Sequence, residues 1–259
     1  MVMLTCAFDV SKDQPLQKNL VMAGFVSEAE RWKEYDLKWR ARLAADNLSY
    51  FHMRSFAQSD GPFKDWRDKE DKRRTLLRDL LDLIAEHAYH KFACVVTSQS
   101  YASLSEAAKH HFAPTAIAVA AKFCAGLVYT WRDQNRYQDQ NPRFVFEQGD
   151  EDKGSLITIM ESLTGYAPSF EYKKDNPEKQ IIAFTPLQAA DILAYEVKKI
   201  ADNLGKPLPE NFRFRFPYQQ LDKIPGEPRV FDLESVPEAE NIARVNEYFR
   251  KYPLGGTVQ

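Results

Sequence analysis

Three acidic residues stand where an apolar pattern would otherwise exclude charge. Asp191 lies inside a predicted helix whose flanking residues are apolar almost all the way round. Asp9 and Glu147 each follow directly after a short apolar run. A carboxylate removed from water needs a cation, either a Lys or Arg side chain or a metal ion, unless it is protonated. Each of the three acids is therefore a candidate functional residue.

The helix that carries Asp191 has the clearest start in the chain. Thr185 is placed to cap it, Pro186 suits a first helical position that needs no amide donor, and Gln188 completes a capping box. Residues three and four positions apart share a helix face, so Gln188 and Tyr195 are among the predicted neighbours of Asp191.

The other two acids end predicted strands, Leu4–Phe8 before Asp9 and Arg143–Phe146 before Glu147. In an open α/β sheet, ligands gather at strand ends. Asp9 could equally be a turn residue, and Asp150 suits the N-cap of the following helix. A strand-end Glu has neither turn propensity nor capping value, which favours a functional role for Glu147.

His52 is a further candidate. It follows Tyr50 and Phe51 in what would be a short strand. A lone His beside aromatic residues is typically a hydrogen-bonded core residue. Near the acids it could instead assist proton transfer or contact a phosphate. It has no second His or Cys at metal-ligand spacing, so the candidate role is catalytic.

Five parts of the chain occur in the order seen in the domain of unknown function 3800 family, which is RNase H-like. They are Asp9 after the first strand, Phe51-His52-Met53, Gly61-Pro62-Phe63, Phe146-Glu147-Gln148-Gly149-Asp150 and Leu187-Gln188-Ala189-Ala190-Asp191-Ile192-Leu193-Ala194-Tyr195. The chain resembles that family over about residues 3–204, most specifically in the last segment. The resemblance implies an RNase H-like fold with an acidic metal site made by Asp9, Glu147 and Asp191.

One position departs from the family pattern. Members usually carry Asp-Glu-Ser-Gly after the first strand, whereas this chain has Asp9-Val10-Ser11-Lys12. Val10 cannot bind a metal. Either the missing Glu is not a ligand, or Asp13 or Asp150 replaces it, or the site is weakened and the chain is a binding protein descended from an enzyme.

Such a cluster supports phosphodiester hydrolysis with Mg²⁺ or Mn²⁺, which prefer oxygen ligands. Two ions about 3.5 to 4 Å apart can activate water and stabilise the leaving oxygen. By analogy with the family, Asp9 would bridge both ions, Glu147 and Asp191 would each complete one side, and Asp150 is a further candidate ligand. Three functions follow: a nuclease, a metal-dependent phosphohydrolase acting on a small nucleotide, and a catalytically silent RNase H-like binding module.

The net charge of −2 counts against tight, non-specific nucleic-acid binding. Local basic segments could still provide it. Residues 64–74 alternate Lys and Arg with acids, which is typical of a solvated helix start. The run Phe212–Phe216 predicts an edge strand with its Phe side on the core and its arginines outward. The nuclease hypothesis still predicts a nucleic-acid partner, DNA or RNA, and a protein partner or homo-oligomer is left open.

With 259 residues and 44% hydrophobic content, the chain can bury one substantial core. We expect an RNase H-like domain over residues 1–204 and a Pro-rich extension over 205–259, with a terminal helix near Pro237–Tyr252, packed on the same domain. Three cysteines in apolar runs suggest no disulfide framework. No signal-peptide pattern or membrane-length apolar run occurs, which predicts a cytoplasmic protein.

The remaining periodicities predict an α/β chain with a mixed central sheet flanked by helices. Leu20–Val26 forms a hairpin with the first strand, and Ser27, with Glu30 three residues on, caps the next helix. Further predicted elements are a helix over 69–88, a strand over 92–97, a helix over 116–131, a helix over 151–164 and a strand near Phe170.

Overall fold

The computed structural model describes residues 3–12, 18–104, 106, 109, 114–149, 152–203 and 214–231. Within these residues six strands form one sheet in the order β5-β4-β1-β2-β3-β6. The strands are β1 (Leu4–Lys12), β2 (Asn19–Glu28), β3 (His90–Thr97), β4 (Arg143–Glu147), β5 (Ser169–Glu171) and β6 (Pro228–Phe231).

Strand directions identify the fold. β2 is antiparallel to both β1 and β3, whereas β4 is parallel to β1, β5 to β4 and β6 to β3. β2 is therefore the only one of these six strands that runs against the others. Five strands in the spatial order 5-4-1-2-3, with the second reversed, are the arrangement of the RNase H-like fold. The predicted α/β class with a mixed sheet is confirmed.

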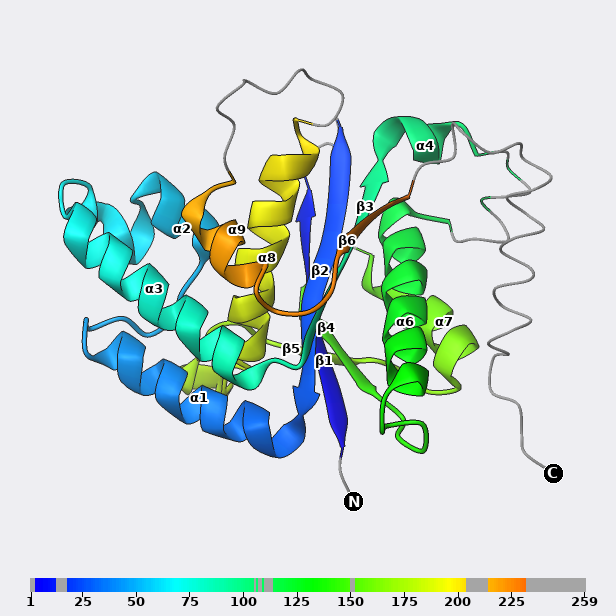
Figure 1. The fold of residues 1–259 in the computed structure, drawn as a ribbon, viewed down its shortest axis with the longest axis horizontal. Helices are drawn as coiled ribbons and strands as arrows, with labels where there is room; N and C mark the ends of the chain where they lie inside the picture. Colours follow the sequence, from blue (N-terminus) through cyan, green and yellow to red (C-terminus); the bar gives the residue numbers. More distant parts are fainter. Residues whose placement is uncertain are drawn as a thin grey trace.

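Helices cover both faces of the sheet. Figure 1 shows α1, α3 and α8 on one side of it and α6 and α7 on the other. The helices are α1 (Ala29–Ala44), α2 (Met53–Gln58), α3 (Glu70–His87), α4 (Ser98–Ala102), α6 (Ala116–Gln134), α7 (Lys153–Thr164), α8 (Pro186–Ala201) and α9 (Phe216–Leu221), with the 3-10 helices η1 (Gly61–Trp66) and η2 (Pro177–Lys179). The helices predicted over 69–88, 116–131 and 151–164 correspond to α3, α6 and α7.

Alternation along β1 decides which side chains meet which helices. Successive residues of a strand point to opposite faces. Cys6 and Phe8 belong to the apolar cluster shared with α6 and α7, while Ala7 packs with Leu187 of α8. Asp9, two residues after Ala7, therefore faces α8. This places the acid of the first strand under the helix that carries the other predicted acid.

Both predicted capping boxes are wrong. Ser27 continues β2, and its hydroxyl donates to the carbonyl of His87 at 2.6 Å. Thr185 does precede α8, but its side chain makes no cap hydrogen bond and donates instead to Asp36 Oδ1 at 2.7 Å. Buried hydroxyls take tertiary partners in preference to the local amides that the capping pattern assumes.

The end of the described chain also differs from prediction. Phe216 starts α9, with Pro217 in its first turn, so the predicted strand over Phe212–Phe216 is wrong where the structure describes it. Residues 212 and 213 lie outside the described residues, as does the predicted helix near Pro237–Tyr252. The edge beside β3 is taken by β6. None of the described helices is both long and apolar enough to cross a membrane.

Candidate active site

The three predicted acids meet around one buried ammonium group. Lys173 Nζ lies 2.7 Å from Asp9 Oδ1, 2.8 Å from Glu147 Oε2 and 3.6 Å from Asp191 Oδ1. Asp9 and Glu147 come from the neighbouring parallel strands β1 and β4, and Asp191 comes from α8 above them. The predicted convergence of Asp9, Glu147 and Asp191 is present, and the cation they share is a lysine.

Lys173 was not predicted from the sequence. It follows β5 in the polar run Lys173-Lys174-Asp175, which resembles a solvated turn. Its side chain is only 7% exposed. Burial by itself would lower the pKa of Lys173, but the attraction of Asp9, Asp191 and Glu147 outweighs burial and raises that pKa above its usual value. Lys173 therefore stays charged inside the cluster.

The cluster holds more acid than one ammonium can neutralise. Burial raises the pKa of Asp9 to about 8, repulsion from Asp191 and Glu147 adds to the rise, and Lys173 opposes it. The short Lys173 contact favours an ionised Asp9, yet this residue is 4% exposed beside two other acids. Burial outweighs the Lys173 contact, so the pKa of Asp9 lies above its ordinary value.

His52 lies at the edge of the acid cluster, at the N-cap of α2. Its Nδ1 accepts from the backbone N–H of Ser55 at 3.4 Å, and its Nε2 lies 3.6 Å from Asp191 Oδ1. Because Nδ1 is the acceptor, the neutral ring carries its proton on Nε2, toward Asp191. The predicted short strand at His52 is wrong, but the ring is beside the acids and 32% exposed, accessible to a substrate.

Gln188 connects the separate parts of the site. Its Oε1 accepts from Trp39 Nε1 and from the Phe51 amide, both at 2.8 Å. Its Nε2 donates to the Lys173 carbonyl at 2.7 Å. One helical turn later, Asp191 Oδ2 accepts from the Met53 amide at 2.6 Å. Gln188 thus fixes the backbone on both sides of the acid cluster, a role that the capping interpretation missed.

A second set of contacts fixes the segment between Lys173 and α8. Arg40 of α1 donates to the Ala183 carbonyl at 2.8 Å and pairs with Asp175 at 2.8 Å. Asp175 in turn accepts from the Ala183 amide at 2.7 Å. Asp36 receives both Arg40 and the Thr185 hydroxyl. The segment carrying Lys173 is therefore held against α1, and this limits where its ammonium can lie.

The acids form the floor of a cavity of about 810 Å³ with a basic rim. Lys12, Arg54, Lys198 and Lys199 line it with His52, and Asp202 is the rim acid, 2.5 Å from Lys198. Its lining residues are Asp9, Val10, Ser11, Lys12, His52, Arg54, Gln58, Glu147, Lys173, Asp191, Tyr195, Lys198, Lys199 and Asp202. Such a cavity suits a substrate with several negative charges that binds together with a cation. The negative charges would contact the basic rim, and the cation would contact the acidic floor.

Val10 borders the cavity, but its side chain does not point toward Lys173. It packs against the apolar cluster on the α6 side of the sheet, whereas Asp9 faces α8. Neighbouring strand residues point to opposite faces, so a Glu at position 10 would also point away from Lys173. The two residues considered as replacements, Asp13 and Asp150, lie outside the described residues.

The donors suit a hard divalent cation, since they are all carboxylate oxygens arranged around one point. As they stand, however, no three His, Cys, Asp or Glu side chains of the described residues are placed to hold a metal ion. Lys173 fills the space between the acids. A divalent cation could bind these carboxylates only if the Lys173 ammonium moved away from them.

No family model and no curated protein matches the chain. Among solved structures, a chain of the PCNA:RNase HII complex from Archaeoglobus fulgidus aligns at 14% identity, covering 85% of this chain and 87% of that chain, with a TM-score of 0.36. A TM-score this low supports no functional argument. The RNase H-like assignment rests on the order and direction of the strands.

Proposed function

We propose that this protein is a divalent-metal-dependent hydrolase of phosphodiester bonds, a nuclease related to the domain of unknown function 3800 family. The observation that supports this proposal is the meeting of Asp9, Glu147 and Asp191 around one buried cation position. These three residues would hold Mg²⁺ or Mn²⁺, with Asp150 as a further candidate. Bound there, the ion would lower the pKa of a water molecule and offset phosphate charge.

The chain's own residues would do the rest of the work. Lys12, Arg54 and Lys199 on the rim would bind phosphates on either side of the scissile bond. The Nε2–H of His52 can donate to a phosphate oxygen or carry a proton to the leaving group. Lys173 would neutralise the acids when no metal is bound. When a metal ion took its place among the acids, the Lys173 ammonium could contact the substrate's negative charge.

The nuclease proposal is tested by Mn²⁺-dependent cleavage of labelled single-stranded DNA, duplex DNA, RNA and RNA:DNA hybrid, with a small nucleotide alongside. We expect cleavage by the wild type and a loss of at least a hundredfold, roughly, in Asp191→Asn, because removing a metal ligand removes the charge that holds the ion. Asp202→Asn, which alters a rim acid of the same cavity, is the matched control. Turnover of the small nucleotide alone would instead support a phosphohydrolase.

Lys173 also supports a second candidate, the catalytically silent binding module. A lysine that already neutralises the acids can make a metal unnecessary to the fold. In that case the basic rim would bind a polyanion without cleaving it.

Lys173→Met separates the two candidates. Without the ammonium, the acids repel one another, so we expect the variant to melt at a lower temperature in EDTA and to recover when Mn²⁺ is added. Lys174→Met is the control, because Lys174 lies over the Tyr50 ring, 4.0 Å from its centre, and not among the acids. Mn²⁺ binding by wild type and variant, measured by calorimetry, supports the nuclease. Binding by the variant alone supports the silent module, and binding by neither contradicts the metal site.

A further inference from the structure

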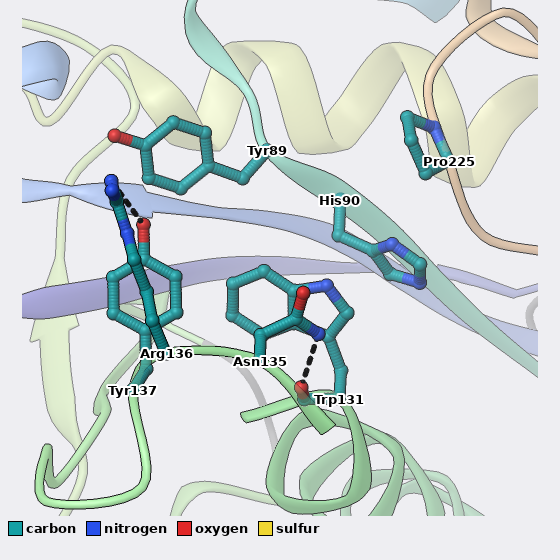
Figure 2. A pocket seen from close by; sticks show the side chains of 7 residues that line it. All are labelled: Tyr89, His90, Trp131, Asn135, Arg136, Tyr137 and Pro225. Carbon is teal, nitrogen blue, oxygen red and sulfur yellow. Dashed lines mark hydrogen bonds between the residues drawn. The ribbon is translucent and has the colours of Figure 1, made fainter. Parts of the chain in front are cut away.

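A second cavity, of about 680 Å³, is shown in Figure 2. Its Tyr89, Trp131 and Tyr137 pack with the apolar cluster on the α6 side of the sheet, whereas the acid cluster faces α8. It is lined by Tyr89, His90, Trp131, Asn135, Arg136, Tyr137 and Pro225. His90 starts β3, and its ring contacts Trp131 of α6 at a centroid distance of 5.7 Å. Asp9 is level with Ala93 of β3, three residues further on, or about 10 Å along the strand. The two cavities are therefore separate sites.

The rings of this cavity form a flat aromatic surface. Tyr137 lies 6.1 Å from Tyr89 at an interplanar angle of 23° and 5.4 Å from Trp131 at 24°. His90 continues the surface at 33° to Trp131. Figure 2 shows the Tyr89, Tyr137 and Trp131 rings turned the same way. A cage for an ammonium group needs rings that surround one point, whereas nearly parallel rings suit a planar ring stacked on them.

Polar groups border the aromatic surface. Asn135 donates through Nδ2 to the Trp131 carbonyl at 2.6 Å, and the same side chain carries an acceptor, Oδ1. Burial, aided by Lys91, lowers the pKa of His90 to about 4, so its neutral ring offers one donor and one acceptor. Arg136 is 76% exposed and lies 3.6 Å from Glu28. An exposed guanidinium beside aromatic faces is suited to a phosphate.

The wall formed by Pro225 is fixed in place. The amide of Lys91 donates to the Pro225 carbonyl at 2.8 Å. The next residue, Gly226, has φ +115°, and a Cβ there would lie 2.0 Å from the Lys91 carbonyl oxygen and 2.8 Å from His90 Nε2. Only glycine allows the chain to pass so close to β3. The cavity is thus preformed by backbone contacts.

We propose that this cavity binds the base of a nucleotide or of single-stranded nucleic acid. The base stacks on Trp131, and its edge bonds to Asn135 and His90. Tyr137 is 7% exposed and supports Trp131 from the side, while the Arg136 guanidinium, which lies 5.3 Å from the centre of the Tyr137 ring and donates to its hydroxyl at 3.3 Å, contacts the adjoining phosphate. Base stacking on aromatic side chains next to cationic groups is a general mode of single-strand binding. The Glu28 carboxylate accepts from the Tyr137 hydroxyl at 3.1 Å and so fixes that ring at its edge. Nothing in this proposal depends on the acid cluster.

Trp131 fluorescence provides the first test. The other three tryptophans, Trp32, Trp39 and Trp66, are buried in the apolar cluster on the α8 side, so a base stacked on the surface quenches Trp131 selectively. In EDTA, which keeps metal from the acid cluster, we expect quenching by AMP, weaker quenching by adenosine and none by ribose 5-phosphate. A tetranucleotide that binds more tightly than AMP identifies a strand as the ligand, and equal binding identifies a mononucleotide. The proposal is overturned if no base-containing ligand quenches Trp131. It is also overturned if choline binds and the nucleotides do not, because the cavity would then be a cage for an ammonium group.

Variants assign the contacts by calorimetry. We expect Trp131→Leu to bind AMP roughly tenfold to a hundredfold more weakly, as loss of stacking predicts. Arg136→Ala, at an exposed position where folding is not at risk, should lower AMP affinity to that of adenosine and leave adenosine binding unchanged. Arg74→Ala, at a 65% exposed arginine of α3, is the control. Asp191→Asn should bind AMP normally, so failure of the nuclease proposal and failure of this one are distinguishable. Equal AMP and adenosine affinity in the wild type excludes the phosphate contact.

Discussion

The candidate site depends on Lys173 and Gln188, two residues whose types and sequence neighbours do not indicate a chemical role. Asp9, Glu147 and Asp191 could be predicted because each interrupts an apolar pattern, and apolar patterns report burial. Lys173 could not, since a lysine in a polar run is ordinarily exposed. Its burial depends on three acids brought from distant parts of the chain, and no local pattern records such a contact.

Gln188 provides a stability prediction at the residue scale. We expect Gln188→Leu to lower the free energy of unfolding by about 3 kcal/mol or more, because Trp39 Nε1, the Phe51 amide and the Lys173 carbonyl would each lose a buried partner. Urea denaturation measures the change. Gln134→Leu, at an exposed end of α6, should stay within about 0.5 kcal/mol of wild type. A Gln188→Leu protein as stable as that control would show that the three contacts are not needed.

At the scale of elements, α8 is the part of the fold on which most of the site depends. It carries Gln188 and Asp191, crosses β1 and β2, and contacts α9 near its end. Its sequence could be assigned to a helix because the segment has a proline start and few polar residues. Which of its polar residues contact which neighbour could not be predicted, since that depends on the packing of α1, β1 and the Lys173 segment around it.

Glu196 of α8 gives a pH prediction. It is 1% exposed, and burial raises its pKa to about 7 despite Arg215, whose Nη1 lies 3.3 Å away without a well-aligned hydrogen bond. The folded state therefore binds a proton that the unfolded state releases above pH 4.5. This contribution to stability is complete below pH 4.5 and is lost as the pH rises through 7.

Glu196→Gln removes that dependence. We expect the melting temperature of Glu196→Gln, relative to that of the wild type, to be higher at pH 8 than at pH 5, because an amide needs no proton to remain neutral. Calorimetric melting at the two pH values measures this. Glu161→Gln, at an exposed position of α7, is the control and should follow the wild type. If wild type and Glu196→Gln lose stability in parallel across this range, Glu196 is ionised in the folded protein.

At the scale of the whole molecule, the strands β1 to β5 and the long helices that cover them could be predicted in their order along the chain, because short apolar runs alternate with longer helical patterns. β6 could not, since it spans four residues and begins with Pro228, a residue that a strand tolerates only at its start or at an edge. The flat aromatic cavity was missed for a related reason. Its rings come from Tyr89 and the first residue of β3, from the end of α6 and from the turn after it, and only the folded arrangement makes them one surface.

The position of β6 has a consequence for solubility. β3 is eight residues long and largely apolar, and β6 pairs with it along Ala93–Val96, while the opposite edge of the sheet ends in the three-residue β5. Exposed, long apolar edge strands recruit strands from other molecules. A chain ending at Ile224 would bare the hydrogen-bonding groups of β3, and we expect it to form large aggregates under conditions where the full chain scatters little light. Static light scattering of the two chains would measure this, and β6 would then be the strand that keeps neighbouring molecules from joining their sheets.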